Sequence, residues 1–394
     1  MKSLLEMLAA VGIRRKMRVI VFFGFVLFPL CLLVFKDLLT PHELTNALAA
    51  WFGLSVVLLV PLSALFSEVL VLRNIRELNG LCARMKEGDL APFEYLPREP
   101  EEGDELQKLK HSLFWVGHVV DSRQKALGAA LSELKDTQER MMESIEYAAV
   151  IQHAFLPREE EFAEVFREHF LLWQQRDRVG GDAHWLKRTR RGFFASVIDC
   201  TGHGVPGAFM TLIVHSLFER MNVNAFEGDP AGLLAAMNVA VKSALARNGD
   251  AALCDDGMDC AMIHVDPLAG RIVFAGARNS LFVCRKREDK PDVEEIRGDR
   301  CGIGYIRSPE GYRFTNHEIV PEDGMRLYAL TDGLLDQVGG GKGFPYGKSR
   351  FRRFLENHRQ LSLPEQGEAL LHSFENYKGR EPRRDDVTVL GFAL

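Results

Sequence analysis

Two long apolar stretches without any charged residue stand out near the N-terminus. Val19 to Phe35 covers seventeen residues, and Ala47 to Ser67 is a second such run. Seventeen residues is at the short end of what crosses a hydrocarbon core of about 30 Å. We expect transmembrane helices over residues 19–35 and 47–72, joined by a short extracytoplasmic loop over 36–46. The alternative for the first stretch is a cleaved signal peptide. It is disfavoured because no small-residue cleavage site follows and a second span does.

Basic residues flank the two apolar runs on one side. Four Lys/Arg residues lie between positions 14 and 18, and Arg73 and Arg76 follow the second run. The positive-inside rule therefore places the N-terminal segment 1–18 and the chain after residue 72 in the cytoplasm. The loop over 36–46 is too short to bury a core, so no ligand-binding domain is expected outside the membrane.

The pattern becomes that of an amphipathic helix after the second run. Four apolar residues recur on one helical face: Ile75, Leu78, Cys82 and Met85. Gly88-Asp89-Leu90 ends this pattern, and a second helix is expected from about Asp104-Glu105-Leu106. The apolar helical face, the helix break and the start of a second helix together resemble a HAMP domain. This two-helix module joins membrane spans to cytoplasmic outputs in bacterial receptors. We expect it over 73–125. The proline usual at its start is missing, and an amphipathic linker without a signalling role is the alternative.

A seven-residue repeat follows the connector. Its members are Leu113, Val120, Leu127, Leu134, Met141 and Ala148. Such a repeat is one seam of a coiled coil, which we expect over 112–148 as a signalling helix that forms a parallel homodimer. The second seam is weak, because it includes Arg123 and Thr137. A single helix that packs on the following domain is the alternative.

Short β-like runs separated by Gly and Asp begin near residue 145, and they predict one α+β domain over 145–394. Several runs adjoin acidic residues. One apolar run ends at Asp199, and a second run leads into Asp332. A third run follows Asp385-Asp386, and Asp182 comes directly after two glycines. Carboxylates gathered in this way would repel one another unless a cation neutralised them. Oxygen-only ligands suit Mg²⁺ and Mn²⁺ rather than zinc, so a binuclear site is the simplest explanation. Each aspartate alone is more often a turn residue.

Four motifs occur in order along this domain: Val179-Gly180-Gly181-Asp182, Asp199-Cys200-Thr201-Gly202-His203-Gly204, Thr331-Asp332-Gly333 and Asp385-Asp386-Val387-Thr388. Together they resemble the SpoIIE/RsbU branch of the PPM (PP2C-like) protein phosphatases. The stretches Cys200 to Thr211 and Leu330 to Gly340 are most similar to SiaA-like phosphatases, which govern biofilm formation. The resemblance implies a PP2C-like α-β-β-α sandwich of two packed antiparallel sheets flanked by helices. Here it would be preceded by two transmembrane helices and a helical HAMP and coiled-coil linker.

The resemblance also implies a metal site. Asp199 would bridge two divalent cations, Mn²⁺ or Mg²⁺, and the backbone carbonyl of Cys200 would complete one coordination shell. Asp332 and Asp385 would hold the other ion, with Asp182 in direct or water-mediated contact. Such two-metal chemistry needs no protein nucleophile, which agrees with a sequence that has neither a GxSxG nor a Cys-x5-Arg motif.

The expected catalytic residues are Asp199, Asp332 and His203. His203 would either give a proton to the leaving alkoxide or, as the favoured role, stabilise its loop through a hydrogen bond. Asp386, next to a ligand, is expected to support the site rather than bind an ion.

The implied function is that of a membrane-anchored, metal-dependent serine/threonine protein phosphatase in bacterial signal transduction. It would act on a cytoplasmic regulatory phosphoprotein, such as a STAS-type anti-sigma-factor antagonist. The chain would be a multi-pass protein of the bacterial inner (cytoplasmic) membrane, with its phosphatase domain in the cytoplasm. The alternative is a non-catalytic signalling scaffold with the phosphatase fold.

Composition excludes several other classes of protein. The first 36 residues carry six Lys/Arg against one Asp/Glu, and the remainder carries 43 against 53. An acidic bulk disfavours nucleic-acid binding. The seven cysteines form no CxxC pair, so neither a disulfide framework nor a zinc site is expected. The glycine-rich stretch 341–349 imitates a phosphate-binding P-loop, but its spacing fails by one residue.

Overall fold

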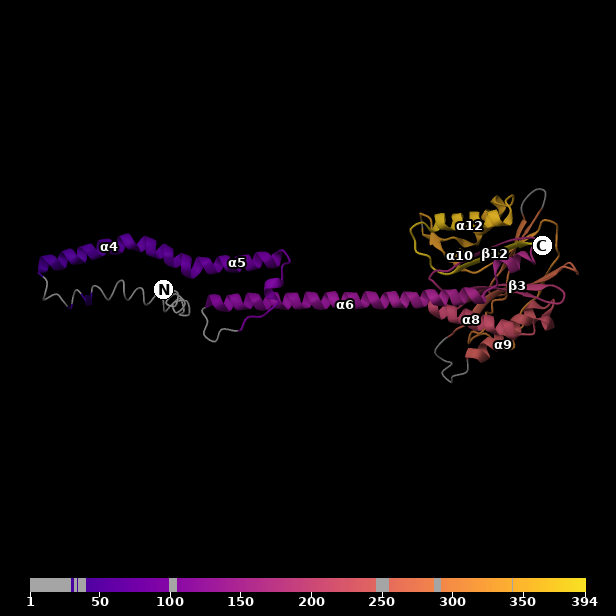
Figure 1. The fold of residues 1–394 in the computed structure, drawn as a ribbon. Coiled ribbons are helices and arrows are strands. Elements are labelled where there is room, and N and C mark those ends of the chain that lie inside the picture. The colour runs from indigo at the N-terminus through magenta and orange to yellow at the C-terminus, as the bar shows by residue number, and fades with distance from the viewer. Residues whose placement is uncertain are drawn as a thin grey trace. The chain divides into compact units, whose positions relative to one another are not determined.

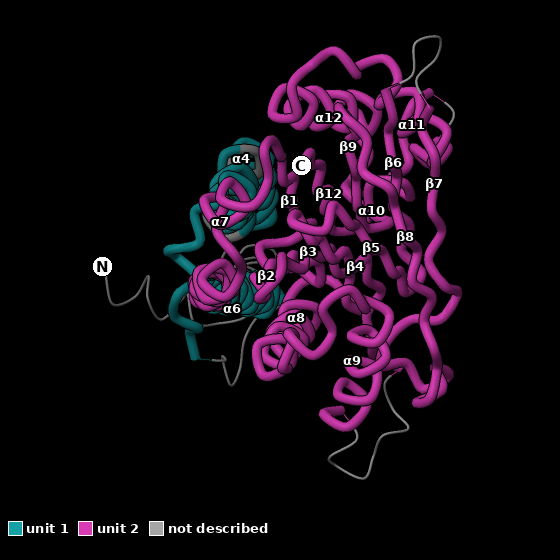
Figure 2. The backbone as a smooth tube through the Cα atoms, turned by 90° about the vertical axis from the view of Figure 1, so that its right-hand side faces the viewer, with its two compact units in different colours: residues 1–137 teal, residues 138–394 magenta. Residues whose placement is uncertain are grey.

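The computed structural model describes residues 30, 31, 34, 40–98, 105–245, 255–286, 292–341 and 343–394. The chain consists of two compact units, residues 1–137 and 138–394, which are coloured separately in Figure 2. The predicted cytoplasmic segment 1–18 and most of the predicted first span lie outside the described residues.

The described part of the first unit is helical. Its elements are α4 (Pro41–Ser67), the π-helical turn η3 (Glu68–Leu72), α5 (Arg73–Lys86), the 3-10 turn η4 (Ala91–Phe93) and the start of α6 (Glu105–Phe155). Thr40 begins α4 with a capping box, in which its hydroxyl and backbone N–H bond with Glu43. Among the described helices, none combines the length and the apolar character needed to cross a membrane. The spans and the HAMP interpretation stay predictions.

The helix break that the sequence predicts at Gly88-Asp89-Leu90 is present. α5 ends at Lys86, and Gly88 adopts a φ of 84°. The connector then turns back through η4, where the buried ring of Phe93 packs on Phe114 at 5.5 Å between centroids. Gly117 permits this packing, because a Cβ there would lie 2.2 Å from the Phe93 ring. The connector and the start of α6 therefore form a small core of their own.

α6 is a single helix of 51 residues, and it covers the whole predicted coiled-coil segment. The side chains in the middle of the predicted seam are exposed: Leu127 by 62%, Leu134 by 64% and Met141 by 61%. This stretch of the helix buries no apolar stripe within the chain.

The second unit contains two five-stranded antiparallel sheets (Figure 1). The first sheet has the order β1 (Glu168–Gln174), β12 (Val387–Ala393), β9 (Arg326–Leu330), β6 (Leu281–Arg285) and β7 (Asp292–Ile296). The second has the order β2 (Asp182–Arg188), β3 (Phe193–Cys200), β4 (Met258–Asp266), β5 (Arg271–Ala277) and β8 (His317–Ile319). A small hairpin joins β10 (Val338–Gly339) to β11 (Phe344–Pro345).

Helices cover the outer faces of both sheets (Figure 2). α8 (Gly204–Arg220) and α9 (Pro230–Leu245) pack on the second sheet, and α11 (Gly347–Asn357) and α12 (Leu363–Lys378) pack on the first. Three shorter elements complete the unit: α7 (Glu159–Ala163), η5 (Val223–Phe226) and α10 (Gly333–Asp336). Three apolar clusters separate the layers, one between the sheets and one beneath each helix pair. The predicted sandwich of two antiparallel sheets flanked by helices is confirmed.

Candidate active site

Three aspartates lie side by side at one end of the second sheet. Asp182 of β2 is paired with Asp199 of β3, and Asp199 is paired with Asp259 of β4. Residues directly opposite each other in an antiparallel ladder point to the same face, with Cβ atoms about 4.5–5.5 Å apart. We call these three residues the carboxylate row.

The carboxylate row faces the space between the two sheets. Along β3, Ala195 and Val197 belong to the core between the sheets, whereas Ile198 and Cys200 belong to the core beneath α8 and α9. Because side chains alternate along a strand, Asp199 shares the face of Val197. The row therefore opens toward the first sheet at one end of the sandwich.

The first sheet brings two more aspartates to the same place. Asp332 follows β9, Asp385 precedes β12, and these two strands are neighbours. The carboxyl groups of Asp332 and Asp199 are close enough for each to affect the pKa of the other. Burial is the main cause of the raised pKa of Asp199 and of Asp332, and neighbouring carboxylates, including Asp385, raise both further. The fold thus gathers the four aspartates that the sequence singled out for metal binding.

Asp182 is almost fully buried, and two threonines orient it. Thr331 and Thr388 each donate a hydroxyl hydrogen bond of 2.7 Å to its Oδ2. Burial raises the pKa of Asp182 well above its ordinary value, although the two hydroxyls act in the opposite direction. The hydroxyls hold Oδ2, so Oδ1 is the oxygen that can face a cation or a water molecule.

Asp386 differs from its neighbour Asp385. Its two carboxylate oxygens accept hydrogen bonds of 2.6 Å from the backbone N–H groups of Arg176 and Gly181. Gly180 permits this approach, because a Cβ there would lie 2.4 Å from the Asp386 carboxylate. Asp386 therefore ties the start of β12 to the loop before β2, which is the supporting role that the sequence suggested.

Cys200 contributes backbone rather than side-chain chemistry. Its N–H donates to the carbonyl of Gly181 at 3.0 Å, and a Cβ on Gly181 would lie 2.6 Å from the Cys200 carbonyl oxygen. Burial raises the pKa of the Cys200 thiol well above its ordinary value, so this thiol is a poor nucleophile. The carbonyl, at the strand end beside Asp199, is the group that the expected role requires.

His203 lies on the surface immediately before α8. Its Nδ1 is 3.0 Å from Oδ2 of Asp177, and its side chain is 44% exposed. Gly202 and Gly204 on either side have φ values of 86° and 64°, so the imidazole is attached to a tight turn. This contact supports the loop-stabilising role. The sequence alone gives no reason to pair His203 with Asp177, which lies 26 positions earlier.

The last turns of α6 reach the site loop through Gln152. Its buried amide nitrogen donates to the carbonyl of Gly180 and to the hydroxyl of Thr211, both at 2.8 Å. Its carbonyl oxygen accepts from the N–H of Gly180 at 3.3 Å. The sequence alone does not predict this contact, because the partner lies 28 residues away.

The donor set fits divalent cations that prefer oxygen. Every candidate ligand is a carboxylate or a backbone carbonyl, as Mg²⁺ and Mn²⁺ prefer. Three of the carboxyl groups have raised pKa values caused first by burial and then by neighbouring carboxylates, and a nearby cation would lower these pKa values. Within the described ranges, no three His, Cys, Asp or Glu side chains converge into a formed metal site. The fit of these residues to two divalent cations therefore depends on the chemistry of the donor atoms and on their charge.

Comparisons with known proteins agree with this fold. Residues 189–394 match the family described as stage II sporulation protein E (SpoIIE). The SiaA PP2C domain of Pseudomonas aeruginosa is similar over 66% of this chain and 98% of its own, with 35% sequence identity and a TM-score of 0.58. The PP2C domain of Bacillus subtilis SpoIIE, solved with part of its regulatory domain, shares 16% identity over 58% of this chain and 63% of its own, with a TM-score of 0.44. No match was found among curated protein sequences.

The second unit therefore has the fold of a PP2C-like phosphatase. The chain belongs to the SpoIIE family, with a phosphatase domain similar to that of SiaA. It is a protein serine/threonine phosphatase. Phosphatases of the PP2C class use divalent metal ions, generally Mn²⁺ or Mg²⁺.

Proposed function

We propose that this protein is a membrane-anchored phosphatase that needs two Mn²⁺ or Mg²⁺ ions and removes phosphate from a cytoplasmic regulatory phosphoprotein. The observation that carries the proposal is that both sheets place aspartates at the same end of the sandwich, namely Asp182, Asp199, Asp332 and Asp385. A non-catalytic scaffold would have no need to keep four mutually repelling carboxylates together. We therefore favour a working catalyst.

Each residue has a distinct task in this proposal. Asp199, at the centre of the site, and the Cys200 carbonyl would hold one ion, with Asp199 shared between the two. Asp332 and Asp385 would hold the other, and Asp182 would orient a ligand water through Oδ1. When bound, two such ions activate water as a nucleophile and neutralise charge on the phosphoryl group.

The chain supplies little proton chemistry of its own at this site. His203 is the imidazole of the motif that follows Asp199, and its Nδ1 is engaged with Asp177. We assign it to holding the turn before α8, so the leaving alkoxide would take its proton from water. The Cys200 thiol takes no part because burial keeps it protonated.

Membrane anchoring is part of the proposal. α4 carries large apolar side chains that are exposed in the chain, among them Phe52 at 72% and Val57 at 71%. The first predicted span precedes it. A lipid environment would cover such residues. The anchored domain would face the cytoplasm of the bacterial inner membrane, where a STAS-type phosphoprotein is the expected substrate and biofilm control the expected process.

The connector would control the phosphatase. The exposed seam of Leu127, Leu134 and Met141 offers a surface for a parallel homodimer. Farther along the same helix, Gln152 holds the loop that precedes Asp182. A change in the helix would therefore reach a metal-binding loop through two hydrogen bonds to Gly180.

Purified full-length protein provides the decisive test. We expect hydrolysis of a phosphoserine peptide with Mn²⁺ or Mg²⁺, no activity in EDTA, and loss of activity in Asp332→Asn. An exposed aspartate outside the site, Asp323, supplies the matched control as Asp323→Asn. Turnover that persists without metal, or full activity of Asp332→Asn, would contradict the two-metal proposal.

Control by the connector is tested separately. Inserting one alanine after Leu127 should change the activity of the full-length protein, and Gln152→Leu should weaken the link that carries the change. If both variants keep the wild-type rate and the wild-type metal dependence, the connector does not control the site.

A further inference from the structure

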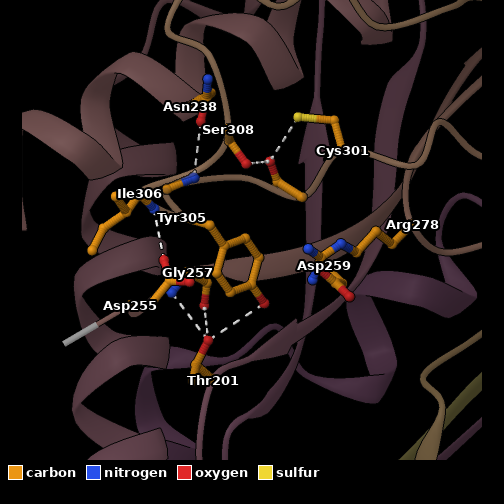
Figure 3. A network of polar contacts seen from close by, with 12 residues as sticks. Thr201, Asn238, Asp255, Gly257, Asp259, Arg278, Cys301, Tyr305, Ile306 and Ser308 are labelled. Carbon is orange, nitrogen blue, oxygen red and sulfur yellow. Dashed lines mark hydrogen bonds and ion pairs between the residues drawn. The ribbon is translucent and has the colours of Figure 1, made fainter.

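The carboxylate row of the second sheet ends beside a guanidinium. Ala277, the last residue of β5, is paired with Cys260 of β4, so Arg278 takes the next position, beside Asp259. Nη1 of Arg278 lies 3.5 Å from Oδ1 of Asp259. Figure 3 shows the two side chains together with Tyr305. Three carboxylates in a line are thus followed by a cation at the outer end.

Arg278 has an unusual backbone conformation. Its φ is 61°, and among the described residues other than glycine it alone has a positive φ. Gly and Asn adopt this region more easily than arginine does. Its backbone N–H is held by the carbonyl of Asp299 at 2.8 Å. An arginine kept in such a conformation suggests that the side chain itself is needed there.

An aromatic ring supports the guanidinium. The guanidinium carbon of Arg278 lies 4.5 Å from the centroid of the Tyr305 ring, a distance that allows a cation–π interaction. The ring cannot move away easily, because it packs against Gly257 and Gly302. A Cβ on these glycines would lie 2.8 Å and 2.4 Å from ring atoms.

The same ring connects to the loop after Asp199. The hydroxyl of Tyr305 lies 3.4 Å from the Thr201 hydroxyl, which also accepts the N–H of Gly257 at 3.0 Å. These contacts are drawn in Figure 3. Arg278 is therefore positioned by the segment that carries the central aspartate of the site.

Most donors of this guanidinium remain available. Of the residues that the structure describes, Asp259 alone accepts a hydrogen bond from it, through a long contact, and the side chain is 46% exposed. A guanidinium has five N–H donors in a planar fork that matches phosphate oxygens. Two other arginines near the aspartates are engaged with the protein. Arg176 donates to the Arg384 carbonyl, and Arg383 donates to the Gln175 carbonyl.

We propose that Arg278 binds oxygens of the substrate's phosphoryl group, and that Tyr305 positions it for this contact. The inference rests on the proposed function of the aspartate site and names a residue that recognises its substrate. Asp259 holds the guanidinium at the edge of the site until an oxyanion takes over the unused donors.

The test uses full-length protein with Mn²⁺ and four kinds of measurement: KM and kcat for a small aryl phosphate, the same for a phosphoserine peptide, the inhibition constant of inorganic phosphate, and the melting temperature. Arg278→Asn removes the charge, and asparagine adopts the positive φ at this position more easily than arginine does. Arg278→Lys keeps the charge but loses the planar set of guanidinium donors. The matched control is Arg271→Asn, at the opposite end of β5, where the exposed Arg271 pairs with Glu318.

We expect Arg278→Asn to raise both KM values and the inhibition constant of phosphate by about tenfold or more, with no loss of melting temperature. Arg278→Lys should lie between Arg278→Asn and wild type, and Arg271→Asn should match wild type. Tyr305→Leu should also weaken phosphate inhibition, and Tyr305→Phe, which keeps the ring, should weaken it less.

Three outcomes would overturn the inference. An unchanged inhibition constant combined with a lower melting temperature would make Arg278 a structural partner of Asp259. A higher KM for the peptide alone would place the contact on the peptide rather than on its phosphoryl group. A wild-type protein without metal-dependent hydrolysis would instead overturn the proposed function itself, and the inference with it.

Discussion

The two sheets contribute to the site in different ways. In the second sheet the aspartates of the carboxylate row stand in register, so the backbone ladder itself forces like charges together. In the first sheet the corresponding positions are taken by Thr331 and Thr388, and the acids lie just outside the strands. The second sheet therefore holds its carboxylates within the ladder, whereas the first sheet has hydroxyls at the equivalent positions and its two carboxylates beside them.

This difference shows where the fold gives up stability for function. Like charges directly opposite each other destabilise a strand pair. Burial is the main cause of the raised pKa of Asp199, and the neighbouring carboxylates of Asp182 and Asp332 raise it further. The threonines of the first sheet are satisfied by neighbouring groups. Functional sites are expected to break the local rules of stable folding, such as keeping like charges apart. Here only the second sheet places like charges directly opposite each other.

The largest effect is expected at the centre of the carboxylate row. Asp199→Asn removes the central carboxylate, which Asp182 and Asp259 flank. Activity should fall by about a thousandfold or more, because several kcal/mol of metal-dependent stabilisation is lost. In EDTA, the same variant should melt at a higher temperature than wild type, since the repulsion is relieved. Phosphopeptide hydrolysis and thermal unfolding measure the two effects. An Asp199→Asn protein that is both inactive and less stable in EDTA would refute the claim that the row is strained.

Metal binding should relieve the repulsion among these aspartates and so stabilise the folded protein. Mn²⁺ at about one hundred times its dissociation constant should stabilise the wild-type protein by about 2.7 kcal/mol. Thermal unfolding with and without Mn²⁺ checks this, and Asp332→Asn should show a smaller shift. Equal shifts in both proteins would place the stabilising ion away from these aspartates.

The hydroxyls of the first sheet should have a moderate effect. Thr331→Val removes one of the two donors to Asp182 and also the acceptor of the Thr388 N–H. Metal affinity should fall by about ten- to a hundredfold, as for other groups that orient a ligand, while kcat at saturating metal changes less. Thr388→Val, which removes only one donor to Asp182, should have the smaller effect. Mn²⁺ titration of activity measures both, and an unchanged half-saturating concentration would leave the threonines without an orienting role.

The smallest effect is expected outside both sheets, at His203. If His203 holds its turn through Asp177, His203→Gln should lower kcat by less than about tenfold, since proton transfer catalysis would be worth about 10²–10⁴. Asp177→Asn should add little to it, because the two residues share one contact. The pH profile of kcat distinguishes the roles. A loss beyond a hundredfold with a changed alkaline limb would restore His203 as the general acid.

Much of this domain could be predicted from local sequence. Strand ends at Asp182 and Asp199 and the aspartates beside β9 and β12 follow from short apolar runs next to acidic residues. The carboxylate row could not be predicted, since the pairing of Asp199 with Asp259 depends on a ladder between segments 60 positions apart.

Residues that support the site were missed for related reasons. Asp299 holds the backbone N–H of Arg278 and Tyr305 supports its guanidinium. Both lie on a later loop, so no local sequence pattern predicts these contacts. The contact of Gln152 with Gly180 requires the end of α6 to meet the loop before β2. Such contacts are properties of the assembled sandwich.

Gly180 and Gly181 let the loop before β2 lie directly against two other segments of the site. A methyl group on Gly180 would come 2.4 Å from the Asp386 carboxylate, and one on Gly181 would come 2.3 Å from the Gly202 carbonyl. The first glycine therefore allows close contact with the start of β12, and the second allows close contact with the loop after Asp199. An alanine at Gly180 would push Asp182 away from the start of β12, and the aspartates of the two sheets would then lie too far apart to share an ion.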